Sequence, residues 1–155
     1  MKKYLVLLVL GIMFLTSCTI TIDVDSLEEL QYYKKDNQTI DRGAYKAYDP
    51  YEVKSTSYFE LKMDIDKFNE DSNYYLEVFF MTKYNFERFK NGYSFNAYQK
   101  RITENYDNYW REENIKPGDY VLVVDYSSKG EITPPFWYWD SYNYDFTLKI
   151  NKMYH

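Results

Sequence analysis

The sequence predicts an all-β protein, an antiparallel β-sandwich with one or two short helical turns, on the strength of three observations. Aromatic residues, which favour strands, are abundant: the 155 residues include 20 Tyr, 10 Phe and 3 Trp. Residues 58–66 and 142–150 alternate apolar and polar side chains, as strands buried on one face do. Residues 73–81 and 119–126 are apolar almost throughout, which is typical of central strands covered on both faces. Strands of both kinds predict two layers of sheet.

The first elements expected along the folded region are a helix and a strand. Ser26 and Glu29 form a capping-box pattern, which predicts a short helix near the sequence LEELQYY. In residues 58–66 the apolar side chains share one face of the predicted strand: Phe59, Leu61, Met63 and Ile65. The charged side chains share the other face, so we expect a half-buried antiparallel strand here.

The middle of the chain predicts a buried strand followed by a helical turn. Residues 73–81 form the strand, and the sequence NFERFKNG forms the turn. We expect Asn85 to cap the helix, Phe86 and Phe89 to face inward, and Gly92 to end it. Residues 98–110 fit both a helix and a loop, because tyrosines recur there at helical spacing among loop-favouring Asn and Asp.

The C-terminal third predicts a turn, a strand, a loop and a last strand. Pro117 and Gly118 suit the two central positions of a type II turn immediately before the strand 119–126. Residues 127–135 read as a loop. The final strand, 142–150, places five apolar residues on one face: Tyr142, Tyr144, Phe146, Leu148 and Ile150.

The N-terminus has the layout of a secretory signal. Lys2 and Lys3 precede an apolar run from Tyr4 to Leu15, and small polar residues follow. The run is shorter than the roughly 20 residues of a membrane-spanning helix. Acidic residues follow it soon after, so we expect cleavage rather than retention.

The end of this run resembles the lipobox of bacterial lipoprotein precursors, in the sequence Leu15-Thr16-Ser17-Cys18. The resemblance implies that Cys18, the only cysteine, becomes the lipidated first residue, and that acyl chains bind the protein to the membrane. The expected organisation is a cleaved signal peptide 1–17, a lipidated tether 18–25 and a single β-sandwich domain 26–155. A cell-envelope location follows. Thr19 after the cysteine favours outer-membrane sorting in a cell with two membranes.

Charge and composition exclude several functions. Removal of residues 1–17 takes away two lysines and no acid, which leaves 17 basic against 24 acidic residues and a formal charge of −7. Nucleic acid and anionic lipid both require a basic face, so neither is an expected partner. The sole histidine is His155, the last residue of the sequence, so we expect neither a histidine-dependent catalytic triad nor a zinc site. No cofactor is expected.

Two carboxylate chemistries stay open as alternatives. A pair of acids would suit a small glycan-active hydrolase, but the 24 acids do not single out a pair. Residues 23–25 (DVD) and 64–66 (DID) offer oxygen ligands for calcium without the loop pattern of a known site. Solvated surface charge explains most of these residues.

Residues 134–144, PPFWYWDSYNY, form the candidate binding patch. Alternation places Trp137 and Trp139 on one face and Tyr138 on the other, and the preceding Pro-Pro favours an edge or loop. Exposed rings of this kind stack on sugars or enter a partner's pocket. Trp110 and Tyr109 extend the patch in this interpretation. The alternative is that the rings fill an aromatic core.

The segment 55–150 resembles small extracellular β-sandwich modules of the pre-peptidase C-terminal-like kind. The resemblance rests on the order of elements and on the Pro-Gly turn that leads into the strand YVLVVD. It implies a jelly-roll-like fold and an accessory or binding role, and it carries over no catalytic residue. A protein or a glycan is the partner expected at the aromatic patch.

The first prediction concerns the anchor. Replacing Cys18 by Ser should abolish membrane association, because the acidic mature domain has no second means of attachment. Fractionation of cells that express the wild type and the variant measures this. Normal processing with the variant still in the membrane fraction would contradict it.

Overall fold

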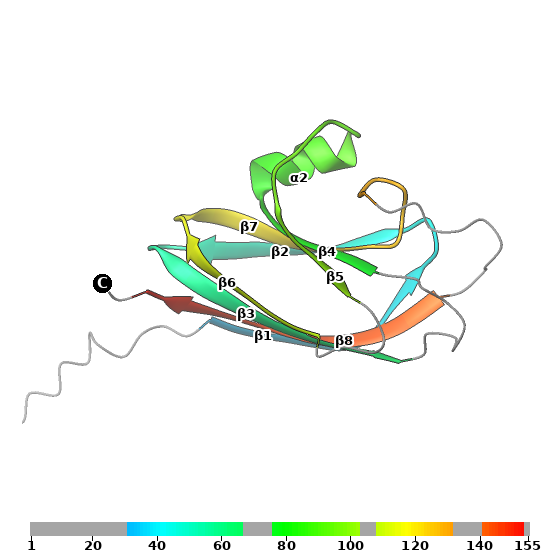
Figure 1. Cartoon of the computed structure of the whole chain (residues 1–155), viewed down its shortest axis with the longest axis horizontal. Coiled ribbons are helices and arrows are strands. Elements are labelled where there is room, and N and C mark those ends of the chain that lie inside the picture. The colour runs from blue at the N-terminus through cyan, green and yellow to red at the C-terminus, as the bar shows by residue number, and fades with distance from the viewer. Residues whose placement is uncertain (1–30, 67–75, 103–107, 132–140, 154–155) are drawn as a thin grey trace, which may run out of the picture.

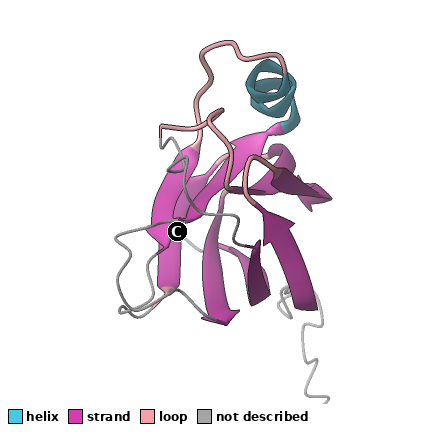
Figure 2. Cartoon of the chain, turned by 90° about the vertical axis from the view of Figure 1, so that its right-hand side faces the viewer, coloured by secondary structure: helices cyan, strands magenta, loops and turns pink. Residues whose placement is uncertain are grey.

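The computed structural model describes residues 31–66, 76–102, 108–131 and 141–153. These residues form eight strands and one helix: β1 (Gln31–Asp41), β2 (Tyr45–Val53), β3 (Ser57–Asp66), β4 (Leu76–Thr82), α2 (Lys83–Lys90), β5 (Tyr98–Ile102), β6 (Tyr109–Ile115), β7 (Gly118–Asp125) and β8 (Ser141–Lys152). Figures 1 and 2 show the strands in two layers, with the helix outside one of them.

Both layers are four-stranded antiparallel sheets. The front sheet has the order β1-β8-β3-β6, and the back sheet has the order β2-β7-β4-β5. The predicted all-β sandwich with short helical structure is therefore confirmed.

The front sheet is centred on the two strands with alternating sequences. β3 and β8 pair along their length, with Leu61 opposite Leu148 and Met63 opposite Phe146. All four of these side chains are buried. Because successive side chains point to opposite faces, the polar residues between them lie on the outer face, as the alternation predicts.

The back sheet is centred on the two apolar strands. β4 and β7 pair antiparallel, and apolar side chains from both faces of each strand are buried. One face, including Phe80 and Leu122, joins the core between the sheets. The other face, including Phe79 and Val121, packs in a second cluster with Phe86 of α2. The prediction that these strands are central is confirmed.

The helix forms where the sequence predicts it, but its cap is different. Phe86 and Phe89 are buried, and Gly92 follows the helix with a φ of 71°, as expected of a glycine that ends one. The N-cap is Thr82, whose Oγ1 accepts a hydrogen bond from the Asn85 amide, so the prediction of Asn85 as N-cap is wrong. Asn85 lies in the first turn and its Oδ1 accepts from the Asn96 amide instead.

The turn at residues 117–118 is in the predicted place but is of another type. The φ of Gly118 is 154°, far from the roughly 80° that a type II turn requires. Asn114, four positions before Gly118, has a φ of 61° and supplies a left-handed residue. The reversal is a crossing from β6 in the front sheet to β7 in the back sheet, so it does not have the geometry of a hairpin turn.

Four strands were not predicted. β1 begins at Gln31, so Gln31, Tyr32 and Tyr33 are strand, and the expected helix near LEELQYY is wrong over these residues. The rest of that segment lies outside the described residues. No element was predicted from the sequence over the residues of β2. In the segment left open between helix and loop, both described parts, β5 and the start of β6, are strand.

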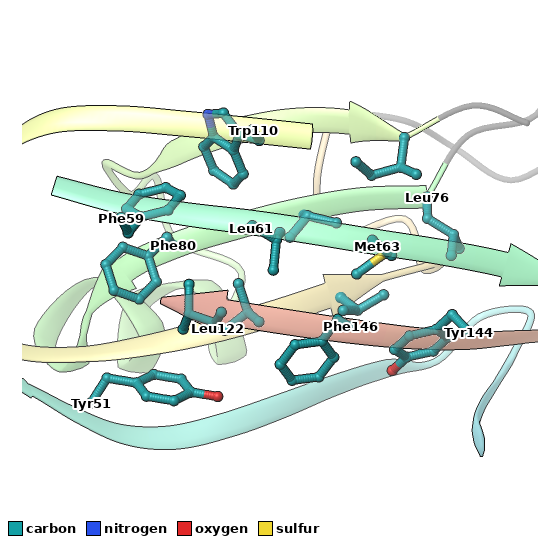
Figure 3. Close-up of a cluster of buried hydrophobic side chains, with 14 of the residues drawn as sticks. Tyr51, Phe59, Leu61, Met63, Leu76, Phe80, Trp110, Leu122, Tyr144 and Phe146 are labelled. Carbon is teal, nitrogen blue, oxygen red and sulfur yellow. The ribbon is translucent and has the colours of Figure 1, made fainter. Parts of the chain in front are cut away.

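The core between the sheets is largely aromatic (Figure 3). The Phe59 ring lies 4.6 Å from the Phe80 ring and 4.7 Å from the Trp110 ring, measured between centroids. Trp110 is 5% exposed, and its indole N–H donates to Glu112 Oε1 at 2.8 Å. The prediction that Trp110 extends an exposed patch is therefore wrong, because the alternation of β6 turns its ring inward and Tyr109 outward.

The second prediction follows from this placement. Trp110→Ala should lower the free energy of unfolding by about 3 to 5 kcal/mol, because it leaves a cavity beside Phe59. Urea denaturation followed by circular dichroism measures the loss. Tyr109→Ala, the neighbouring change on the outer face, is the matched control and should cost less than about 1 kcal/mol. Equal losses in the two variants would contradict the assignment.

Candidate ligand-binding face

The outer faces of the two sheets differ in what covers them. Over the back sheet lies α2, together with Phe95 and Ala97 from the segment that follows it. Figure 1 shows the helix on the side away from β1, β3 and β8. Among the described residues, no helix or strand packs on the outer face of the front sheet. This face therefore presents its side chains to solvent.

Strand register fixes which side chains meet on this open face. Across the four strands, one row holds four residues, namely Tyr32, Lys149, Glu60 and Arg111. The next row holds Lys34, Thr147, Lys62 and Tyr109. A tyrosine thus stands on each edge strand, with polar and charged side chains of β8 and β3 between them.

These two rows enclose a shallow pocket of about 320 Å³. The tyrosine pocket, as we call it, is lined by Tyr32, Glu60, Lys62, Tyr109, Thr147 and Lys149. Tyr32 is 53% exposed and Tyr109 is 42% exposed, so both rings are available to a ligand. Burial and the adjacent Glu60 carboxylate raise the pKa of Tyr109.

The charges around the pocket are unevenly paired. Arg111 contacts Glu60 at 3.2 Å and Glu113 at 2.9 Å, and its guanidinium lies 4.1 Å from the centre of the Tyr58 ring. The Glu60 carboxylate is therefore already engaged by a cation. Because several partners hold Arg111, this corner of the pocket is pre-organised.

The lysines of the pocket are less well paired. Lys62 lies 3.9 Å from Asp64, at the limit of an ion pair. Lys149 is half-buried, and within the described part of the chain its ammonium has no ion pair. The floor of the tyrosine pocket therefore carries two lysines that the described residues pair only at long distance or not at all.

Of the described residues in the predicted binding patch, Tyr109 lines this pocket, and Trp110, Tyr142 and Tyr144 do not. Trp137, Tyr138 and Trp139 lie outside the described residues, as does Cys18. Tyr142 and Tyr144, at the end of the predicted patch, are 2% and 1% exposed and belong to the core. Tyr109 is exposed as predicted.

A second exposed aromatic group lies on the opposite side of the molecule. Tyr84 of α2 and Tyr93 after it are 71% and 61% exposed. Arg88 lies between them, 5.9 Å and 5.8 Å from the two ring centres, and its Nε donates to the Ser94 carbonyl.

A pair of buried acids in the back sheet is a candidate for the carboxylate pair that a hydrolase would need. Glu77 of β4 and Asp125 of β7 are cross-strand neighbours, and they are 1% and 2% exposed. Asp125 accepts hydrogen bonds from the Ser127 amide at 2.9 Å, the Ser127 hydroxyl at 2.5 Å and the Gly130 amide at 3.0 Å. Glu77 accepts from Gln99 Nε2 at 2.9 Å.

Gly130 fills the space between these two carboxylates. A Cβ at Gly130 would lie within 3.0 Å of oxygens of both Glu77 and Asp125, so a side chain there would displace at least the Glu77 carboxylate. A glycosidase needs room for a sugar or a water between its acids, and this pair has none. Asp125 holds the described start of the loop, residues 127–131, onto the back sheet. Within the described residues no three His, Cys, Asp or Glu side chains form a group that could hold a metal ion.

Comparisons with known proteins place no family on the chain. No protein-family model matches it, and no curated protein is similar in sequence. Solved structures with a related backbone include PliG, a periplasmic inhibitor of g-type lysozyme from Aeromonas hydrophila, at 11% identity and a TM-score of 0.46, covering 80% of this chain and 88% of PliG. FLHE is 7% identical with a TM-score of 0.43, covering 81% of this chain and 98% of FLHE.

A third similar structure is the VP2 subviral particle of infectious bursal disease virus. It is 9% identical with a TM-score of 0.40, and the match covers 80% of this chain and 33% of VP2. Similarity at this level carries no information about ligand or activity. Of the helices in the described residues, none has the length and apolarity needed to cross a membrane.

The third prediction concerns Asp125. Burial raises the pKa of Asp125, and the hydrogen bonds from Ser127 and Gly130 offset this only in part. Because the folded pKa exceeds the unfolded one, the folded state binds the proton more tightly, and its stability is lost as pH rises through the folded pKa. The free energy of unfolding of the wild type, relative to Asp125→Asn, should therefore increase as pH falls from about 7 to about 4.

Denaturant titrations of both proteins at each pH measure this difference. Asp119→Asn, an exposed change on the same strand, controls for the general loss of a charge. A difference that stays constant, or shrinks toward low pH, would show that burial does not dominate at Asp125.

Proposed function

We propose that this chain is a non-catalytic binding protein of the cell envelope. The observation that carries the proposal is the tyrosine pocket, which lies on a sheet face that no described element covers. Two exposed rings around a polar floor suit recognition of a ligand, either a glycan or a protein. The rest of the sandwich serves as a rigid support for this face.

The surroundings of three described acids support binding without catalysis. Glu60, the carboxylate in the tyrosine pocket, is ion-paired to Arg111. Glu77 and Asp125 are closed off by Gly130. A hydrolase would need two acids facing one open cleft, and neither of these sites offers that arrangement.

Attachment through lipid on Cys18 completes the proposal. The lipobox-like sequence supports it, and residues 19–30 would then separate the lipid from Gln31, where the front sheet begins. Fully extended, such a segment reaches roughly 40 Å, enough to let the open face of the sandwich point away from the bilayer. Thr19 supports the outer membrane as the destination in a cell with two membranes.

The fourth prediction tests the pocket. Tyr32→Ala and Tyr109→Ala should each weaken retention on isolated envelope material by roughly 3- to 10-fold, because each removes one stacking surface. The mature protein in detergent is applied to cell-wall polysaccharide and, separately, to solubilised envelope proteins. Melting should change little, since both rings are exposed.

Tyr84→Ala is the matched control, an exposed tyrosine over the other sheet, and it should bind as the wild type does. Wild-type retention of both pocket variants would refute the assignment of the site. Loss of retention in Trp137→Ala or Trp139→Ala alone, with unchanged melting, would move the site to residues 134–144. Release of shorter glycan products would instead support the hydrolase.

A further inference from the structure

We infer that the tyrosine pocket recognises an acidic saccharide, one whose sugar rings bear carboxylates. This inference deepens the proposed binding function and rests on it. Three features of the pocket carry it: the placement of the two tyrosines, the two lysines on the floor, and the chemistry of the lining as a whole.

The two tyrosines are placed to hold an extended ligand. Tyr32 lies on edge strand β1 and Tyr109 on edge strand β6, with β8 and β3 between them. Three strand spacings separate the edges, or roughly 14 Å. A ligand that touches both rings must therefore cross the sheet and is longer than one sugar ring. Flat rings at both ends suit the apolar faces of pyranoses.

The floor selects for negative charge. Lys149 lies between Tyr32 and Glu60 in the register, is half-buried and has no ion pair among the described residues. Glu60, its cross-strand neighbour, is ion-paired with Arg111 rather than with Lys149. Lys62 on the neighbouring row is held only weakly, 3.9 Å from Asp64. A ligand carboxylate above Lys149 and Lys62 would form ion pairs with their ammonium groups.

The lining favours a saccharide over a protein. The pocket is lined by two tyrosines, two lysines, a glutamate and a threonine, with no aliphatic side chain. The centre of a protein interface is normally apolar and depleted of charge. Hydroxyls of a sugar can pair with Thr147, with the tyrosine hydroxyls and with the free lone pairs of Glu60. The overall negative charge of the chain also makes a localised cationic pocket stand out.

The test uses a pair of probes that differ in charge alone. Oligogalacturonate and its methyl ester present the same sugar chain with and without carboxylates. Calorimetric titration of the lipidated mature protein in detergent should show binding of the acid form, and at least 10-fold weaker binding of the ester. Raising the salt concentration should weaken the acid form selectively, since exposed charges are screened.

Substitutions in the pocket test which residues bind the two probes. Lys149→Gln should weaken the acid form by about 5- to 10-fold and leave the ester unchanged, because it removes one charge-assisted contact. Lys116→Gln, an exposed lysine outside the pocket, is the matched control and should have no effect. Tyr32→Ala and Tyr109→Ala should weaken both forms, because stacking does not depend on the carboxylate.

The outcomes separate this inference from the proposed function. Equal binding of acid and ester, lost in the tyrosine variants, overturns the acidic preference and leaves the binding function standing. The same holds if neither probe binds while the tyrosine variants still lose retention on envelope material. If neither probe binds and the tyrosine variants retain envelope material as the wild type does, both proposals fall.

Discussion

The structure depends on a chain of aromatic contacts that joins the two sheets. Phe59 of the front sheet packs on Phe80 of the back sheet, with 4.6 Å between ring centres, and Phe80 stacks on Tyr120 at 4.9 Å. With one cysteine in the sequence, no intramolecular disulfide can hold the layers together. The inward rings must therefore supply the cohesion, and they also fix strand register, because a one-residue slip would turn every ring to solvent.

Register in turn decides what the open face presents. Once Leu61 and Leu148 point inward, Glu60, Lys62 and Lys149 must point outward, and the tyrosine pocket follows from that constraint. The back sheet presents no comparable open face, because α2 covers its outer face and packs with it in a second hydrophobic cluster. Both faces of the back sheet are thereby buried, whereas no described element covers the outer face of the front sheet.

The sequence predicted the strands whose pattern is unambiguous. β3 and β8 alternate, and β4 and β7 are apolar almost throughout, so the pattern of apolar residues identified all four. β1 was missed because it is an edge strand with a mostly exposed, charged sequence, interrupted by a bulge between Lys35 and Gln38. Tyr32 was missed with it. The pocket could not be foreseen, since it depends on pairing between strands far apart in the chain.

Tyrosine shows why residue type alone could not separate core from surface. Tyr144 is 1% exposed, and its hydroxyl shares a 2.7 Å hydrogen bond with the hydroxyl of Tyr48, so its polar atom is satisfied inside the sandwich. Burial raises the pKa of Tyr144 and keeps it neutral there. Tyr109 has the same side chain but faces outward beside Glu60. A ring with a polar tip is equally suited to both environments. Whether a tyrosine is buried or exposed depends on which of the two strand faces its position occupies. The sequence alone shows this only where it is already known which positions face inward.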